Sequence, residues 1–407
     1  MSNRLMGAFR AFSYPNYRIF ITGHAISRIG TWMERTAVSW VVYDMTHSTF
    51  MLGLTVFASQ FPSFLLSLYG GIISDRYSRH KIVLVTQIAS MIQATILAVL
   101  VLFGSAQVWQ ILTIITLLGI INAFDVPARQ SLVHQLVDKP EDLSNAVALN
   151  SSVVNVARLT GPALSGIVLS AFGAGICFSL NALSYLAVIV SLLFLKLQPQ
   201  EIKPKKHSNY EEIKEGINYM KHHPQLGPIS LYIAVMSLLV LPYNTMLPEF
   251  AKEVFHGDAQ TYGYIYSCIG VGALLGSLFL ASLKEGAKLV NVLLFNATLL
   301  GISLIGFSFM RNLPVALGIA VVSGFCALTQ STICLTIIQT RSAANMRGRM
   351  ISLFAMALFG MLPLGSLLVG SVSSRVGSPV TMAIQGVLSF VIVASFYKFI
   401  RRKAATN

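Results

Sequence analysis

The run ALSYLAVIVSLLFL, residues 182–195, is almost entirely apolar and carries no charged side chain. Polar and apolar residues do not alternate in it, as they do in a strand of a membrane β-barrel. A bilayer offers the backbone no hydrogen-bond partners, so such a segment must close its own hydrogen bonds as a helix. The run therefore predicts a membrane-spanning helix.

Runs of the same kind recur from one end of the chain to the other. Of the 407 residues, 55% are apolar and 11% are charged, whereas soluble proteins carry about 25% charged residues. Each run has roughly the length of a helix that crosses a bilayer. The sequence predicts an all-α membrane protein with twelve transmembrane helices, at 17–43, 50–73, 82–103, 108–126, 143–171, 175–195, 228–250, 261–282, 289–310, 314–338, 349–372 and 379–400.

The longest polar stretch, 196–227, divides the predicted spans into two sets of six. It contains YEEIKEGINYMKHHP (210–224), whose apolar residues recur at helical spacing, as in an amphipathic helix on a membrane surface. We therefore expect an N-terminal six-helix bundle over 1–195, a cytoplasmic linker over 196–227 and a C-terminal six-helix bundle over 228–407. The halves also look like repeats, since Gly166 and Gly173 match Gly370 and Gly377 at one offset of 204 residues. Repeats of this kind are typical of transporters whose halves rock about a site near the membrane centre.

The formal net charge of +14 could suggest nucleic-acid binding, but the distribution of the charges indicates membrane topology instead. Lysines and arginines gather in the loops on the side of the N-terminus, and Lys252, Arg311 and Arg375 alone lie in loops on the other side. Positively charged loops stay in the cytoplasm. We therefore expect both termini in the cytoplasm, the lipid bilayer as a partner and no nucleic acid. The four cysteines lie in predicted spans without a Cys-x-x-Cys pair, so no metal site is expected.

The loop GIISDRYSRHK (71–81) follows the second predicted span. It resembles the signature loop of the major facilitator superfamily, with matches at Gly71, Asp75, Arg76, Arg79 and Lys81, although Ser78 stands at a position where the family usually has glycine. We expect Gly71 to let two helices approach closely. Asp75 is expected to latch the cytoplasmic side, at a helix N-terminus or on an arginine. The alternative is a loop that acts only as a topology signal.

The fourth predicted span ends in DVPAR (125–129). This resembles the acid-x-Pro-x-Arg element that many facilitator proteins carry at the same place. The resemblance implies that Asp125 and Arg129 join the charge network of Arg76 and Arg79 at the cytoplasmic gate. The alternative is a solvated helix end.

Longer stretches resemble one branch of the superfamily, which contains enterobactin-type siderophore exporters and macrolide efflux proteins. They are GTWMERTAVSWVVYDMT (30–46), VPARQSLVHQLV...LSNAVALNSSVVNVARLTGPALSG (126–166) and MRGRMISLFAMALFGMLPLGSLLVG (346–370). The resemblance implies a monomeric antiporter of the bacterial inner membrane. The motif GPALSG (161–166) matches the drug/proton antiporter motif only in part, and the fourth span lacks the embedded arginine of those proteins.

The first predicted span carries charges at membrane depth, where a charge is costly and normally faces a cavity or a partner. On a helical wheel Arg28, Thr31, Glu34 and Arg35 share one face. Together with residues of other spans we expect them to form the substrate and proton-coupling site: Asn155 and Arg158, Tyr243 and Asn244, and Gln330. Three arginines against one carboxylate favour a substrate with anionic groups. In the alternative, Glu34 simply neutralises Arg158 or Arg35 and locks two helices.

These patterns favour a secondary active transporter, specifically a proton-coupled exporter of a small, partly anionic metabolite such as a siderophore. It would need no cofactor, because the proton gradient supplies the energy. A broad-specificity, macrolide-type drug efflux pump is the alternative, followed by a metabolite uptake carrier. A polytopic membrane enzyme is disfavoured, since the sequence has no His-Glu-x-x-His, Gly-x-Ser-x-Gly or Walker motif.

Overall fold

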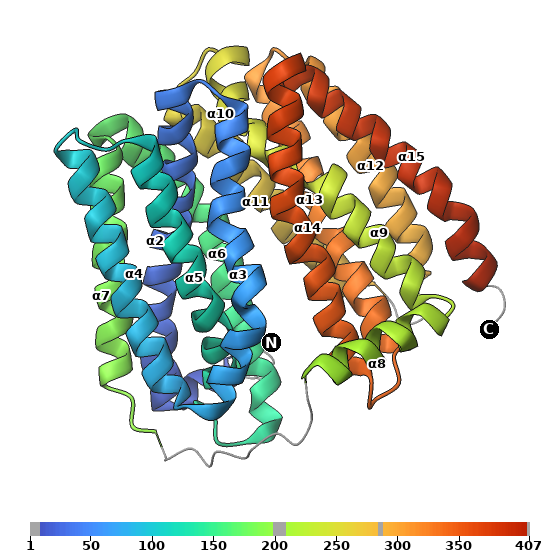
Figure 1. Cartoon of the computed structure of the whole chain (residues 1–407), viewed down its shortest axis with the longest axis horizontal. Helices are drawn as coiled ribbons and strands as arrows, with labels where there is room; N and C mark the ends of the chain where they lie inside the picture. Colours follow the sequence, from blue (N-terminus) through green and yellow to red (C-terminus); the bar gives the residue numbers. More distant parts are fainter. Residues whose placement is uncertain (1–8, 198–208, 284–287, 405–407) are drawn as a thin grey trace. The chain divides into compact units, whose positions relative to one another are not determined.

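A computed structural model describes residues 9–197, 209–283 and 288–404, and over these ranges the chain is helical without any strand (Figure 1). In chain order the elements are η1 Arg10–Ser13, α2 Pro15–Thr46, α3 Thr49–Arg76, α4 Arg79–Leu102, α5 Val108–Val133, α6 Pro140–Phe172, α7 Ala174–Leu193, α8 Asn209–His222, α9 Leu226–Leu239, η2 Leu241–Met246, α10 Leu247–Glu249, η3 Phe250–Val254, α11 Ala259–Ser282, α12 Leu289–Phe309, α13 Leu313–Arg341, α14 Arg347–Val376 and α15 Ser378–Ala404. The helices α2–α7 and α9–α15 coincide with the twelve predicted spans to within a few residues.

Eleven of the described segments are long and apolar enough to cross a membrane, with α9 to η3 forming one of them. The remaining long helix, α2, has 32 residues but carries Arg28, Glu34 and Arg35 in its middle. Counting α2, the protein has twelve transmembrane helices, and the prediction of an all-α membrane protein is confirmed.

The chain divides into two compact units. Unit 1 is Met1–Met45 with Ala58–Pro204, and unit 2 is Thr46–Phe57 with Lys205–Asn407. The first turns of α3 therefore pack with the second half of the chain. There the hydroxyl of Thr49 donates to the carbonyl of Gly370 at 3.3 Å, and Gly53 leaves no room for a side chain against the backbone of Ser366.

Within unit 1, helix α4 packs against α5 and α7. Helix α2 packs closely on α7, because Gly23 and Gly30 present bare backbone there. A side-chain carbon at Gly23 would collide with Ser191, and one at Gly30 with Ser184. Small residues at such contacts let helix backbones approach each other in a membrane.

Unit 2 repeats this arrangement, with α12 packed against α13 and α15 as α4 is against α5 and α7. The repeat extends to backbone conformation. Helix α6 ends at Gly173 with φ 82°, and α14 ends at Gly377, 204 residues further on, with φ 85°. Only glycine adopts such angles readily at a helix end. The similarity found between the two sequence halves thus corresponds to equivalent helix ends.

The seventh span is not one regular helix, in contrast to the uninterrupted span predicted at 228–250. It changes from the α-helix α9 to the 3₁₀ turns of η2 and then, through α10, to the π-helical turn η3. Pro242 and Pro248 lie in this stretch, and proline removes a backbone donor and displaces the preceding turn. The amide nitrogen of Gln385, on α15, donates to the carbonyls of Leu239 and Val240 at 3.2 and 3.3 Å. A side chain thereby satisfies carbonyls at the point where the regular helix stops.

The predicted amphipathic helix exists as α8, which Figure 1 shows lying across the helices of unit 2. Arg349 at the start of α14 forms an ion pair with Glu215 at 2.8 Å. The hydroxyl of Tyr219 accepts from the backbone N–H of Ala343 at 3.2 Å. The helix is thus attached to the loop between α13 and α14 and to the start of α14.

Replacing Gln385 by leucine is expected to destabilise unit 2, because the carbonyls of Leu239 and Val240 lose a buried donor. The cost of such an unsatisfied buried group is about 1–3 kcal/mol. The thermal unfolding midpoint of purified protein in detergent should fall. The matched control is Ser395→Ala on the same helix, whose exposed hydroxyl bonds only to its own turn. Equal midpoints for the two variants would contradict the role given to Gln385.

Candidate functional site

The polar residues of α2 are divided between the interior of unit 1 and its surface. Glu34 is 2% exposed, whereas the adjacent Arg35 is exposed. The carboxylate of Glu34 accepts a hydrogen bond from the amide nitrogen of Gln93 on α4 at 3.1 Å and another from that of Asn181 on α7. Both partners are neutral. Because neighbouring helix positions are about 100° apart, Glu34 and Arg35 cannot point the same way.

This arrangement differs from the alternative in which Glu34 neutralises Arg35 or Arg158, since the described residues contain no such ion pair. Tyr185 and Cys177 lie within electrostatic range of the carboxylate. The side-chain oxygen of Gln93 is buried without a hydrogen-bond partner in the described part of the chain. The sequence did not reveal Gln93 and Asn181 as partners, because each lies on a helix far from α2 in the chain.

The guanidinium groups of two arginines lie against the ring of Trp32. The guanidinium carbons of Arg35 and Arg158 lie 5.4 and 5.3 Å from the ring centre, which is the range of a cation–π contact. Arg28, two turns before Arg35 on α2, interacts electrostatically more with Arg129 and Asp125 than with Arg35. The structure therefore brings Arg35 and Arg158 together and places Arg28 closer to the Asp125–Arg129 pair. Asn155 lies one turn before Arg158 on α6, and Thr31 donates to the carbonyl of Ser27 at 2.8 Å.

A second group of charged residues links α5 to α4 and α2 in unit 1. Asp125 pairs with Arg129 at 3.0 Å and accepts from Thr86 at 2.9 Å and from Gln87 at 2.8 Å. Arg129 also contacts Nε2 of His24 at 3.2 Å. A guanidinium only donates, so this ring nitrogen is the acceptor and the imidazole is neutral. The predicted Asp125–Arg129 pair is present, but its further partners come from α4 and α2.

The signature loop joins α3 to α4, and Arg79 reaches the backbone carbonyl of Ser131 on α5 at 3.4 Å. One expectation for this loop is wrong. A side-chain carbon at Gly71 would meet nothing within 4 Å, whereas one at Gly70 would collide with the carbonyl of Ala123. The close approach between α3 and α5 is therefore made by Gly70. Of the remaining predicted gate residues, Asp75 is half-buried, and Arg76 and Lys81 are exposed.

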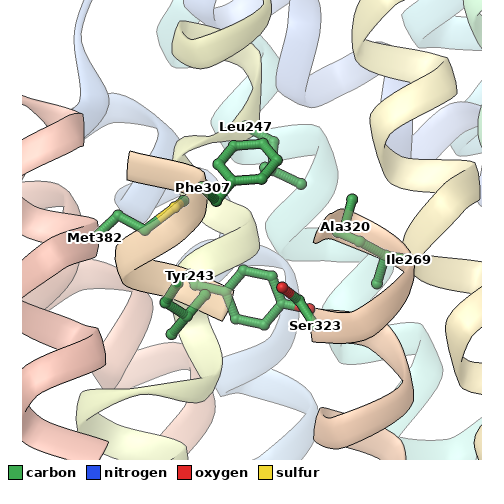
Figure 2. A pocket seen from close by; sticks show the side chains of 8 residues that line it. Tyr243, Leu247, Ile269, Phe307, Ala320, Ser323 and Met382 are labelled. Atoms are coloured by element: carbon green, nitrogen blue, oxygen red, sulfur yellow. The ribbon is translucent and has the colours of Figure 1, made fainter. Parts of the chain in front are cut away.

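The predicted site residues of the second half lie within unit 2. Gln330 on α13 is fully buried and accepts from the hydroxyl of Tyr232 at 2.7 Å. Tyr243 is buried in η2, and its neighbour Asn244 is half-buried. Figure 2 shows Tyr243 beside Ser323 at a small, mainly apolar pocket. The pocket is lined by Tyr243, Leu247, Ile269, Leu304, Phe307, Ala320, Ser323 and Met382. Tyr243 and Gln330 thus belong to the interior of unit 2.

The profile of a family described as transmembrane secretion effectors matches residues 6–406, nearly the whole chain. The chain belongs to this family of the major facilitator superfamily. It is similar to a staphyloferrin A transporter of Staphylococcus aureus, with 28% identity over 95% of this chain and 96% of that protein. It is also similar to an enterobactin exporter of Shigella boydii, with 25% identity over 95% of this chain and 94% of the relative.

Solved structures support the fold. The nucleoside transporter NupG superposes with a TM-score of 0.72 at 13% identity, over 95% of this chain and 99% of NupG. A bacterial homologue of the lysosomal transporter Spinster superposes with a TM-score of 0.66 at 17% identity, over 96% of each chain. The major facilitator fold is therefore confirmed, and the chain is a transporter rather than an enzyme.

The substitution Asp125→Asn is expected to destabilise unit 1 by up to about 3 kcal/mol, because it leaves the partly buried Arg129 charged without its counter-ion. The yield of monodisperse protein and the thermal midpoint in detergent should both fall. Asp125→Asn combined with Arg129→Gln should recover part of the loss, because no unpaired charge then remains. If the single variant is as stable as the unmodified protein, the pair does not hold these helices together.

Proposed function

We propose that this protein exports a siderophore, or a metabolite with similar anionic groups, from the bacterial cytoplasm by alternating access. Two relatives support the substrate class, because staphyloferrin A and enterobactin are siderophores. Both align along nearly the whole chain, so the similarity includes the helices that carry the charges. The same comparisons favour this function over macrolide-type drug efflux.

The observation that carries the proposal is that the middle parts of α2 and α6 hold three arginines, Arg28, Arg35 and Arg158, against the one carboxylate of Glu34. Arg35 and Arg158 lie against one indole, while Glu34 accepts hydrogen bonds from two neutral amides. Arginines at membrane depth face a cavity or a partner rather than lipid. A carboxylate of a substrate would give them charge-assisted hydrogen bonds.

Proton entry is proposed to drive export, with Glu34 as the proton carrier and no cofactor. A carboxylate held by neutral amides can gain and lose a proton without breaking an ion pair. The side chain of Gln93 can form a hydrogen bond with Glu34 in both its ionised and its protonated form. Its NH₂ donates to the carboxylate, and after an amide flip its free oxygen could accept from the protonated acid.

The proposal also covers the membrane in which the protein acts and its orientation there. The protein is proposed to act as a monomer in the bacterial inner membrane, and the charge distribution supports both termini in the cytoplasm. Asp75 of the signature loop would latch the cytoplasmic side together with the basic residues around it. This function needs no metal, enzyme activity or nucleic acid.

Deleting the gene is expected to remove one chelator from the culture medium under iron-poor growth. Mass spectrometry of the medium, with an iron-binding assay, would identify it, and re-expression of the unmodified protein would restore it. Iron-rich cultures are the control, because siderophore synthesis is low there. Unchanged chelator export with new sensitivity to macrolides would instead establish drug efflux.

Glu34→Gln is expected to abolish accumulation of that chelator against a gradient while leaving downhill exchange measurable, since glutamine keeps the shape but cannot be ionised. Proteoliposomes with an imposed pH gradient would provide the measurement. The matched control is Glu141→Gln, which makes the same change at an exposed position on α6. If the Glu34 variant still pumps in response to the pH gradient, the coupling site lies elsewhere.

A further inference from the structure

Arg28 on α2 is a charged side chain at membrane depth without a bonding partner in the described part of the chain. Its guanidinium forms no hydrogen bond and no ion pair there, although its Nε atom is buried. A guanidinium group keeps its charge in a protein and only donates hydrogen bonds. Burying such a charge without a counter-ion is strongly unfavourable. The position therefore requires an acceptor that the described residues do not supply.

The acid that interacts electrostatically with Arg28 is Asp125 of α5, and its carboxylate is already in use. One carboxylate oxygen accepts from Nε of Arg129 at 3.0 Å. The other accepts from Thr86 at 2.9 Å and from Gln87 at 2.8 Å. Asp125 thus neutralises Arg129, which lies on its own helix, rather than Arg28.

Glu34, the buried acid of α2, is bonded elsewhere as well. Its carboxylate accepts from the amides of Gln93 and Asn181. Six residues separate it from Arg28, which places the two side chains about 120° apart around the helix. The phenol of Tyr185 on α7 lies within electrostatic range of both. The electrostatic neighbour of Arg28 on this side is therefore a neutral phenol.

The charges around Arg28 do not balance. His24 lies one turn before Arg28 on the same face of α2, and its Nε2 accepts from Arg129 at 3.2 Å, so the ring is neutral. Arg28 and Arg129 bring two positive charges, and Asp125 brings one negative charge. This set therefore lacks one negative charge, and the guanidinium without a counter-ion is that of Arg28.

We infer that Arg28 binds one carboxylate group of the substrate, beside the Asp125–Arg129 pair. The inference rests on the proposed function and deepens it, because it selects one of the three arginines. A carboxylate only accepts hydrogen bonds and so complements a guanidinium group. It also carries the single charge that the set lacks, whereas a phosphate monoester carries nearly two. The Asp125–Arg129 pair contributes by keeping Asp125 from neutralising Arg28.

Calorimetry on the purified full-length protein tests the inference with simple probes. Citrate carries carboxylates, triethyl citrate has the same skeleton with its carboxylates esterified, and sulfate is a doubly charged oxyanion. We expect citrate to bind, with an affinity that falls as salt rises, and the other two to bind at least tenfold more weakly. Absence of citrate binding, or equal binding of triethyl citrate or of sulfate, would overturn the inference.

Arg28→Met separates a binding residue from a structural one. Methionine keeps an unbranched side chain but has no charge, and we expect at least a tenfold loss of citrate affinity. The thermal unfolding midpoint in detergent should rise by a few degrees, because an unpaired buried charge is removed. A lower midpoint would show that Arg28 stabilises the fold through a partner, and would overturn the inference, as would unchanged citrate affinity.

Arg18→Met is the matched control, since it removes the same charge at an exposed position of α2. It should leave citrate affinity unchanged, and a loss equal to that of Arg28→Met would reduce the effect to the net charge of the protein and overturn the inference. These measurements use neither transport nor a siderophore. Citrate binding that depends on Arg28, in a protein whose deletion leaves chelator export unchanged, would refute the proposed function and leave the carboxylate site standing. Loss of chelator export on deletion, without citrate binding, would do the reverse.

Discussion

The hydrogen bonds from Gln93 and Asn181 to Glu34 are the interactions on which the rest of unit 1 depends. Lipid offers no partner to a carboxylate at membrane depth, so the protein itself must supply its donors. Two neutral amides do so from α4 and α7, and α2 can approach α7 because Gly23 and Gly30 lack side chains. The hydrogen bonds of the Glu34 carboxylate thus go to neutral amides rather than to the arginines of α2 and α6.

The buried and charged side chains of unit 1 form two sets with different bonding partners. In one set, Asp125 pairs with Arg129, and neutral His24, Thr86 and Gln87 complete the hydrogen bonds. In the other set, the guanidinium groups of Arg35 and Arg158 lie against the ring of Trp32. The first set suits a structural role, because the acid and the arginine neutralise each other.

The sequence was sufficient for those features that follow from local composition and spacing. Apolar runs predicted the twelve spans, and the offset of 204 residues predicted that Gly173 and Gly377 are equivalent. Features set by contacts between distant helices could not be predicted. Helical spacing placed Glu34 on a polar face but could not show that Gln93 and Asn181 are its partners, and the signature loop indicated Gly71, although Gly70 makes the close contact. Likewise, the sequence could not show that Tyr243 lines a small pocket in unit 2 or that Gln330 accepts a hydrogen bond from Tyr232.

The same repeat also shows how the two halves differ. Gly161 and Gly365 are equivalent by that offset of 204 residues, and each lets its helix pack closely on the first span of its own half. In unit 1, Gly161 packs against Trp32, and the ring of Trp32 contacts the guanidinium groups of Arg35 and Arg158. In unit 2 Gly365 packs against the carbonyl of Leu238 and the ring of Pro242, where the seventh span loses its regular helix. The same close glycine contact thus lies beside two arginines in unit 1 and beside an irregular, uncharged segment in unit 2. The two equivalent glycine contacts therefore differ in chemistry, because the one in unit 2 holds backbone and proline rather than cations.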